Sequence, residues 1–273
     1  MGTEEDQIME NIQSRGKSII IWPFLSQAYG AILVLVTRPL PMLQLTVKES
    51  AGLSLIYVTL VLAGAYLILY LLRKGLIKFL QLVFLGSLFA SSMLSLNQVL
   101  SGIKYNTLIS FLVSISLILL WKRPGMIGNL VKTIFSASIS YVIVSTFPDA
   151  FILFLLGFLA VYDAYSVFKG PLGEIFDSLE LRIEVLSPLL VTQQGIGLGI
   201  GDLLVYSLAA SFSAKSIGFP LVLLPLASLN IGILITLNLL LKRKSPLPGV
   251  TIPMALWIPC FLLAKLLHFL GSS

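Results

Sequence analysis

The stretch GIGLGIGDLLVYSLAA, residues 195–210, is apolar and rich in glycine except for one acidic side chain, Asp202. An ionised aspartate at the middle of a membrane helix costs roughly 2.5 to 3.5 kcal/mol, even on the lenient insertion scale. Such residues therefore usually face a polar cavity and serve a function. If the surrounding chain lies in a membrane, this stretch marks a candidate functional site.

The composition supports a membrane setting. Of 273 residues, 57% are hydrophobic and 11% are charged, whereas about a quarter of the residues of a soluble domain are charged. The apolar segments approach the roughly 20 residues that a helix needs to cross a bilayer, and they lack the alternation of barrel strands. We therefore predict an all-α integral membrane protein. The net charge of +6 does not indicate a nucleic-acid partner, because the basic residues lie in short loops between apolar runs.

The pattern of apolar runs predicts nine transmembrane helices. They lie at about 18–37, 52–72, 76–95, 107–121, 128–146, 149–168, 196–217, 220–241 and 249–270. We divide the chain into a six-helix part (1–168), a cytoplasmic loop (169–195) whose mixed charge favours a short amphipathic helix, and a three-helix part (196–273).

The distribution of lysine and arginine predicts the orientation. If the loops alternate between the two sides, one side receives 13 of the 18 basic residues, and cytoplasmic loops carry such an excess. The N-terminus is therefore predicted to be cytoplasmic and the C-terminus to lie outside.

Only two of the 12 acidic residues, Asp163 and Asp202, lie well inside predicted spans. The sixth span ends near Lys169 and the seventh starts near residue 196, so each aspartate is expected about 9 Å from the cytoplasmic boundary. Two carboxyl groups in one dry site do not both ionise easily, so one is expected to keep its proton. Such a pair supplies the acid and the base that hydrolyse a peptide bond without a metal or a covalent intermediate.

The residues around both aspartates resemble motifs of the presenilin and signal peptide peptidase family of intramembrane aspartyl proteases. VYDAYSVFKGPL (161–172) resembles the YD motif and the KGPL that follows it in presenilins, and GIGDLLVYS (199–207) resembles the GxGD motif. A third family motif, PAL, corresponds to KRKSPLPGV (242–250), where SPLP stands in place of PALP. The first proline and the alanine of that motif are therefore not matched.

The resemblance implies a presenilin-like bundle and an intramembrane aspartic endopeptidase of the GxGD type, similar to archaeal or bacterial relatives. It implies catalytic roles for Asp163 and Asp202, no cofactor or metal, and transmembrane proteins or peptides as substrates. A homo-oligomer is compatible with it. Residues expected to bind substrate or shape the site are Tyr162, Gly199, Gly201, Pro246, Leu247 and Pro248.

These residues also have physical interpretations of their own. Gly199 and Gly201 would let a helix or a substrate backbone approach Asp202, although glycines in membrane helices often serve packing alone. The prolines would leave backbone groups free for an extended substrate, although Pro248 also suits a plain helix start. Tyr162 could bond near the pair or anchor at an interface.

Two other functions remain open from the residues alone. A prepilin-type peptidase also uses a membrane GxGD aspartate, but typically has fewer spans. An ion-coupled secondary transporter would use both aspartates for proton or sodium coupling, and would show ion flux without cleavage.

Overall fold

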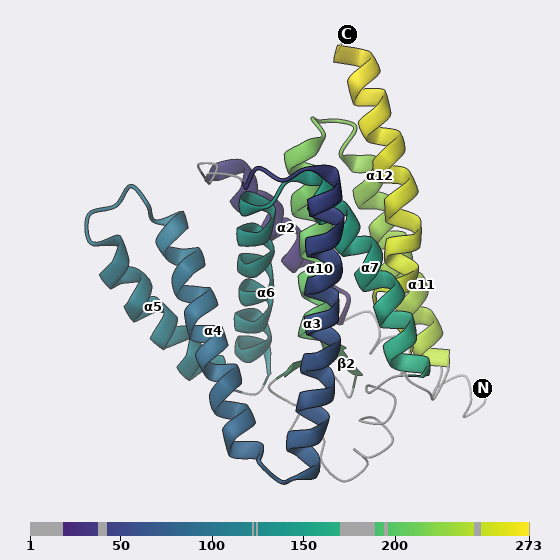
Figure 1. Cartoon of the computed structure of the whole chain (residues 1–273). Helices are drawn as coiled ribbons and strands as arrows, with labels where there is room; N and C mark the ends of the chain where they lie inside the picture. The colour runs from purple at the N-terminus through teal and green to yellow at the C-terminus, as the bar shows by residue number, and fades with distance from the viewer. Residues whose placement is uncertain are drawn as a thin grey trace, which may run out of the picture.

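The computed structural model describes residues 19–37, 43–121, 123, 125–169, 189–193, 196–242 and 247–272. Within them, one α-helix lies at each of the nine predicted spans, and two short strands lie between α7 and α10 (Figure 1). The elements are α2 (Ile21–Val36), α3 (Val47–Arg73), α4 (Ile77–Val99), α5 (Asn106–Trp121), α6 (Met126–Thr146), α7 (Asp149–Phe168), β1 (Leu190–Gln193), β2 (Ile196–Gly199), α10 (Ile200–Ser216), α11 (Leu223–Lys242) and α12 (Thr251–Ser272).

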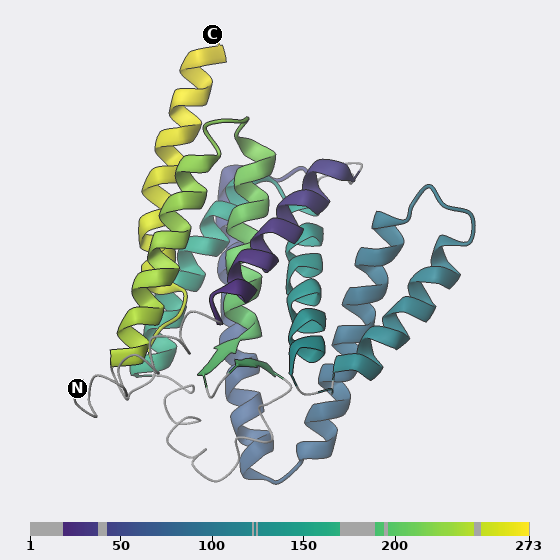
Figure 2. The same ribbon diagram turned by 180° about the vertical axis from the view of Figure 1, so that it is seen from behind.

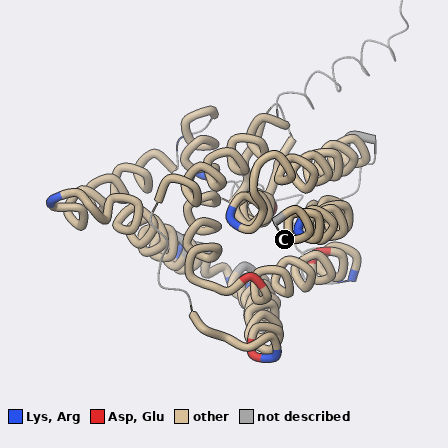
Figure 3. Tube along the Cα trace, turned by 90° about the horizontal axis from the view of Figure 1, so that it is seen from above, with Lys and Arg blue, Asp and Glu red and all other residues tan. Residues whose placement is uncertain are grey.

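Six of these helices, α3, α4, α6, α7, α11 and α12, are long and apolar enough to cross a membrane. Seen from above, only scattered positions of the described trace are charged (Figure 3). The chain is therefore a multi-pass membrane protein. The shorter helices α2 and α5 have 16 residues each and α10 has 17, so the full count of nine transmembrane helices stays a prediction.

Helix α10 lies at the centre of the bundle and packs against α2 and α6 (Figures 1 and 2). Gly30 permits the close approach of α2, because a Cβ atom at that position would collide with the hydroxyl groups of Ser207 and Ser211. Further pairs are α3 with α7, α11 with α12, and α4 with α5, the last of which extends to one side. The helix that carries Asp202 is thus enclosed by protein on most of its length.

The chain is not purely α-helical where the seventh span was predicted to begin. Residues 196–199 form β2, which pairs antiparallel with β1 from Leu190↔Gly199 to Gln193↔Ile196. Gly197 and Gly199 each cost a helix about 1 kcal/mol relative to alanine, so an extended pairing competes successfully there. The predicted amphipathic helix of the loop falls mainly on residues 170–188, outside the described residues; the described end of the loop is β1.

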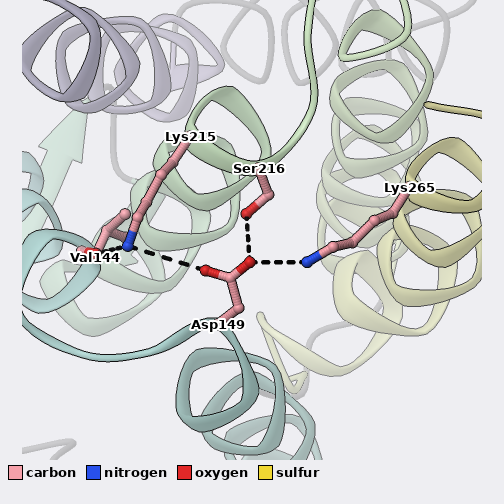
Figure 4. A network of polar contacts seen from close by, with 5 residues as sticks. All are labelled: Val144, Asp149, Lys215, Ser216 and Lys265. Carbon is pink, nitrogen blue, oxygen red and sulfur yellow. Dashed lines mark hydrogen bonds and ion pairs between the residues drawn. The ribbon is translucent and has the colours of Figure 1, made fainter. Parts of the chain in front are cut away.

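A polar network joins the start of α7, the end of α10 and the second half of α12 (Figure 4). Asp163 and Asp202 lie toward the opposite ends of α7 and α10. Asp149 Oδ2 accepts hydrogen bonds from Lys265 Nζ at 2.8 Å and Ser216 Oγ at 3.3 Å. Lys215 Nζ lies 4.0 Å from Asp149 Oδ1 and donates to the carbonyl of Val144 at 2.7 Å. One carboxylate therefore links three helices.

We expect Asp149→Asn and Lys265→Met each to lower the free energy of unfolding by about 0.5 to 1 kcal/mol. The effect is modest because the two side chains are 41% and 43% exposed. Thermal unfolding in detergent measures it, with Lys48→Met, an exposed lysine at the start of α3, as the control. Equal melting temperatures for all variants would show that the network adds nothing to stability.

Candidate active site

Asp163 lies on α7, a little over one turn before the helix ends, and is 9% exposed. Its Oδ2 atom accepts three hydrogen bonds, from the amides of Val250 (2.7 Å) and Thr251 (3.1 Å) and from Thr251 Oγ1 (3.1 Å). These amides lie at the start of α12, where N–H groups have no acceptor within the helix and the helix dipole is positive. All three bonds are made by Oδ2, so Oδ1 is left for other partners.

Asp202 lies in the first turn of α10 and is half-buried. Its carboxyl group lies directly against Gly249, where an added Cβ atom would be 2.7 Å from Oδ2 and 2.8 Å from Cγ. A Cβ atom on Gly199 would lie 3.2 Å from the same Oδ2. Asp202 therefore occupies a space that exists because neither residue has a side chain.

The structure brings the two carboxyl groups together around residues 249–251. Gly249 contacts Asp202, and the next two amides donate to Asp163. Tyr206, which is 1% exposed, donates its hydroxyl to the carbonyl of Gly249 at 2.7 Å. The segment is thus held from α7 and from α10.

The predicted position of Asp202 within its helix was wrong. Asp202 was expected six residues inside a helix that starts near residue 196, but α10 begins at Ile200 and Asp202 is its third residue. The strand β2 takes up the intervening residues because its glycines favour extended pairing. Asp202 meets Asp163 through the shared segment before α12, with β2 leading into the site.

The predicted glycines and tyrosine differ in their surroundings. Gly199 ends β2 and contacts Asp202, whereas a Cβ atom on the exposed Gly201 would meet nothing within 4 Å. Tyr162 is half-buried, and its hydroxyl accepts a 3.4 Å hydrogen bond from Ser166, one turn further along α7. Gly201 therefore contacts no other described helix, and the partner of Tyr162 is on its own helix.

The proline motif leads directly to the segment that the two acids share. Pro248 is buried and Leu247 is half-buried, immediately before Gly249. Pro246, the other predicted proline, lies outside the described residues. Leu247 and Pro248 therefore directly precede the residue that contacts Asp202.

Sequence reasoning missed four residues of the site. Tyr206 carried a signal, because it follows Asp202 by four positions and lies on the same face of α10. Gly249 also carried one, as a glycine directly after the proline motif. Val250 contributes only its backbone amide, which any residue type provides, so nothing in its identity pointed to the site. Thr251 contributes its amide and also its hydroxyl, but a threonine at a helix start is too common to be a signal by itself.

The chemically reactive side chains of the site are two carboxyl groups, Asp163 and Asp202. Among the described residues, no group of three or more histidine, cysteine, aspartate or glutamate side chains could hold a metal ion. Two acids that share one segment can divide the tasks of general acid and general base.

Two solved structures of a presenilin family intramembrane aspartate protease, from crystals in space groups C222 and P2, are similar to this chain. The first has a TM-score of 0.65 at 18% sequence identity, and the match covers 92% of this chain and 99% of the solved one. The second has a TM-score of 0.62 at 19% identity, with 92% and 97% covered. No family model and no curated protein matches the chain. The class is therefore defined by fold: this chain has the fold of a presenilin-family intramembrane aspartate protease, as the sequence motifs predicted.

Proposed function

We propose that the protein is an intramembrane aspartic endopeptidase, which hydrolyses peptide bonds within transmembrane segments by means of Asp163 and Asp202. The observation that carries the proposal is the segment 249–251, which touches one carboxyl group through Gly249 and binds the other through two amides. The likeness in fold to intramembrane aspartate proteases supports it.

In the proposed reaction, the ionised member of the pair removes a proton from water while the water oxygen attacks the substrate carbonyl carbon. The protonated member donates its proton to the carbonyl oxygen, which gives a neutral tetrahedral intermediate. That intermediate collapses when a proton reaches the amide nitrogen and the C–N bond breaks, which yields a carboxyl group and an amine.

A transmembrane substrate must unwind before this attack, because each helical peptide group is protected by its own hydrogen bonds. Strand β2 offers a place for the unwound segment. Thr192 of β1 turns its N–H and C=O toward Asn129 of α6, so its partner Gly197 also turns its backbone groups away from β1. Gly197 is exposed, and an extended substrate paired with this edge would lead toward Asp202.

The proposal includes an orientation. With a cytoplasmic N-terminus, the site would lie near the cytoplasmic side and the Asp149 network on the outer side. Substrates would be transmembrane proteins or peptides in the same bilayer, and the chain would function alone or as a homo-oligomer.

The test is an assay of the purified protein in detergent with several labelled single-span peptides, and with products identified by mass. We expect a cut inside the span, with unwound or helix-breaking sequences cut faster. An ion-coupled transporter would instead leave every peptide intact and move protons or sodium ions in liposomes. A prepilin-type peptidase would cut at the membrane boundary of its substrate rather than within the span.

A further inference from the structure

One face of α6 carries a buried polar stripe that the proposed reaction does not use. The stripe consists of Asn129, Lys132, Ser136 and Ser140, spaced three or four residues apart so that they share one face, and all are at most 6% exposed. Burying a lysine or an asparagine inside a membrane helix is costly unless the group is paired. The stripe therefore calls for an explanation.

All four side chains lie within hydrogen-bonding distance of backbone carbonyl groups of β1 or α10. The two serine hydroxyls share their protons with carbonyl groups of α6 itself, Lys132 O at 3.0 Å and Ser136 O at 2.9 Å. Ser136 Oγ lies 3.3 Å from the carbonyl oxygen of Ile200, and Ser140 Oγ lies 2.8 Å from that of Leu204, so these bonds flank Asp202 by two residues on each side. The other two members of the stripe, Asn129 and Lys132, bind β1. The polar stripe of α6 thus runs along β1 and the first turns of α10.

Two residues of the stripe hold β1 in place through hydrogen bonds to its backbone. Asn129 Nδ2 donates to the carbonyl of Thr192 at 2.8 Å, Asn129 Oδ1 accepts from the amide of Thr192 at 3.3 Å, and Lys132 Nζ donates to the carbonyl of Leu190 at 2.6 Å. A two-stranded sheet alone is at best marginally stable, and its open edges invite a shift in pairing. The two side chains bind three outward-facing backbone groups of β1, so α6 covers this edge and the edge of β2 is left for another strand.

We propose that Asn129 and Lys132 are positioning residues, which hold β1 and, through its pairing, β2 in one register relative to Asp202. They thereby determine which peptide bond of an unwound substrate reaches the two acids. This inference rests on the proposed function for the choice of bond, whereas the anchoring of the strands is a property of the fold. A slip of β1 by one residue would turn every side chain of that strand to the other face.

The first test measures the strands without any substrate. Hydrogen exchange of residues 190–199 is followed in Asn129→Leu and Lys132→Met, which keep similar shapes but lose the polar groups. We expect exchange at least tenfold faster than in the wild type for both. Thr133→Val is the matched control, since Thr133 is equally buried on α6 and its hydroxyl donates to Asn129 O within the helix. If Asn129→Leu does not fold, Lys132→Met decides the result.

The second test identifies the cleavage products of the same variants. We expect the wild type and Thr133→Val to cut mainly one bond. The two stripe variants should spread the cuts over neighbouring bonds and raise KM several-fold, with a smaller change in kcat.

The possible outcomes separate the two proposals. Unchanged exchange in a folded Lys132→Met protein would overturn the anchoring role. Faster exchange with an unchanged cleavage pattern would overturn the control of the cleaved bond. A wild-type protein that cuts no peptide would instead count against the proposed function, and the exchange result would still decide whether the stripe anchors the strands.

Discussion

Replacement of either Asp163 or Asp202 by asparagine is expected to reduce cleavage of a transmembrane substrate by about a thousandfold or more. Each acid is assigned a proton transfer that an amide does not perform, and a positioned acid or base contributes about 10² to 10⁴ in rate. Because the two act as a unit, the double variant should be no slower than the slower single variant. Initial rates with one labelled peptide measure this.

The structure explains why these variants should still fold. An asparagine at position 163 keeps an oxygen that accepts from Val250 and Thr251, and Asp202 is only half-buried. Melting temperatures in detergent check this point. Asp149→Asn serves as the control, since it removes a carboxylate from the other end of α7 and should remain active when assayed well below its melting temperature. A single Asp163 or Asp202 variant that keeps a tenth of the wild-type rate, with the same cut, would refute the pair.

Replacement of Gly249 by alanine is expected to reduce cleavage by about a hundredfold or more. The new Cβ atom would lie 2.7 Å from Asp202 Oδ2 and 3.0 Å from Oδ1, so either the acid or the segment must move. The segment is held by Tyr206 at Gly249 O and by Asp163 at the next two amides. A displacement of the order of 1 Å at a catalytic group costs about a hundredfold in rate.

Gly157→Ala is the matched control for this effect. Gly157 lies on α7, the helix that carries Asp163, but a Cβ atom there meets nothing within 4 Å. We expect it to retain the wild-type rate, because alanine is a better helix former than glycine. If Gly249→Ala is as active as Gly157→Ala, the close contact with Asp202 has no role in the reaction.

The positions of the helices and the two candidate aspartates were predictable from the sequence, because hydrophobicity and charge are visible in single residues. The places of the nine helices follow from runs of apolar residues, since each run has to be removed from water wherever it lies in the fold. The two aspartates stood out because charge is costly in such runs. The three motifs around them predicted the presenilin-like fold that the solved structures confirm.

The pairing of β1 with β2 and the contacts of the polar stripe on α6 were not predictable from the sequence. Residues 196–199 are apolar enough to continue a helix, and their pairing with residues 190–193 depends on a partner strand whose contribution is backbone rather than side chains. Lys132 is one of the 13 basic residues that the pattern assigns to the cytoplasmic side, and the structure buries it against β1. Its acceptor is a carbonyl group 58 residues away.

The sequence by itself determined that this is a helical membrane protein with two acids in apolar surroundings, because hydrophobicity and charge act locally and are visible in single residues. Only the tertiary structure decided how the acids meet. The amides of Val250 and Thr251 and the carbonyl groups bound by α6 belong to the backbone, which is the same at every position. The glycine at position 249 is visible in the sequence, but its contact with Asp202 is not. These backbone groups reach Asp163 and the polar stripe only because the packing of α6, α7, α10 and α12 brings them within hydrogen-bonding distance.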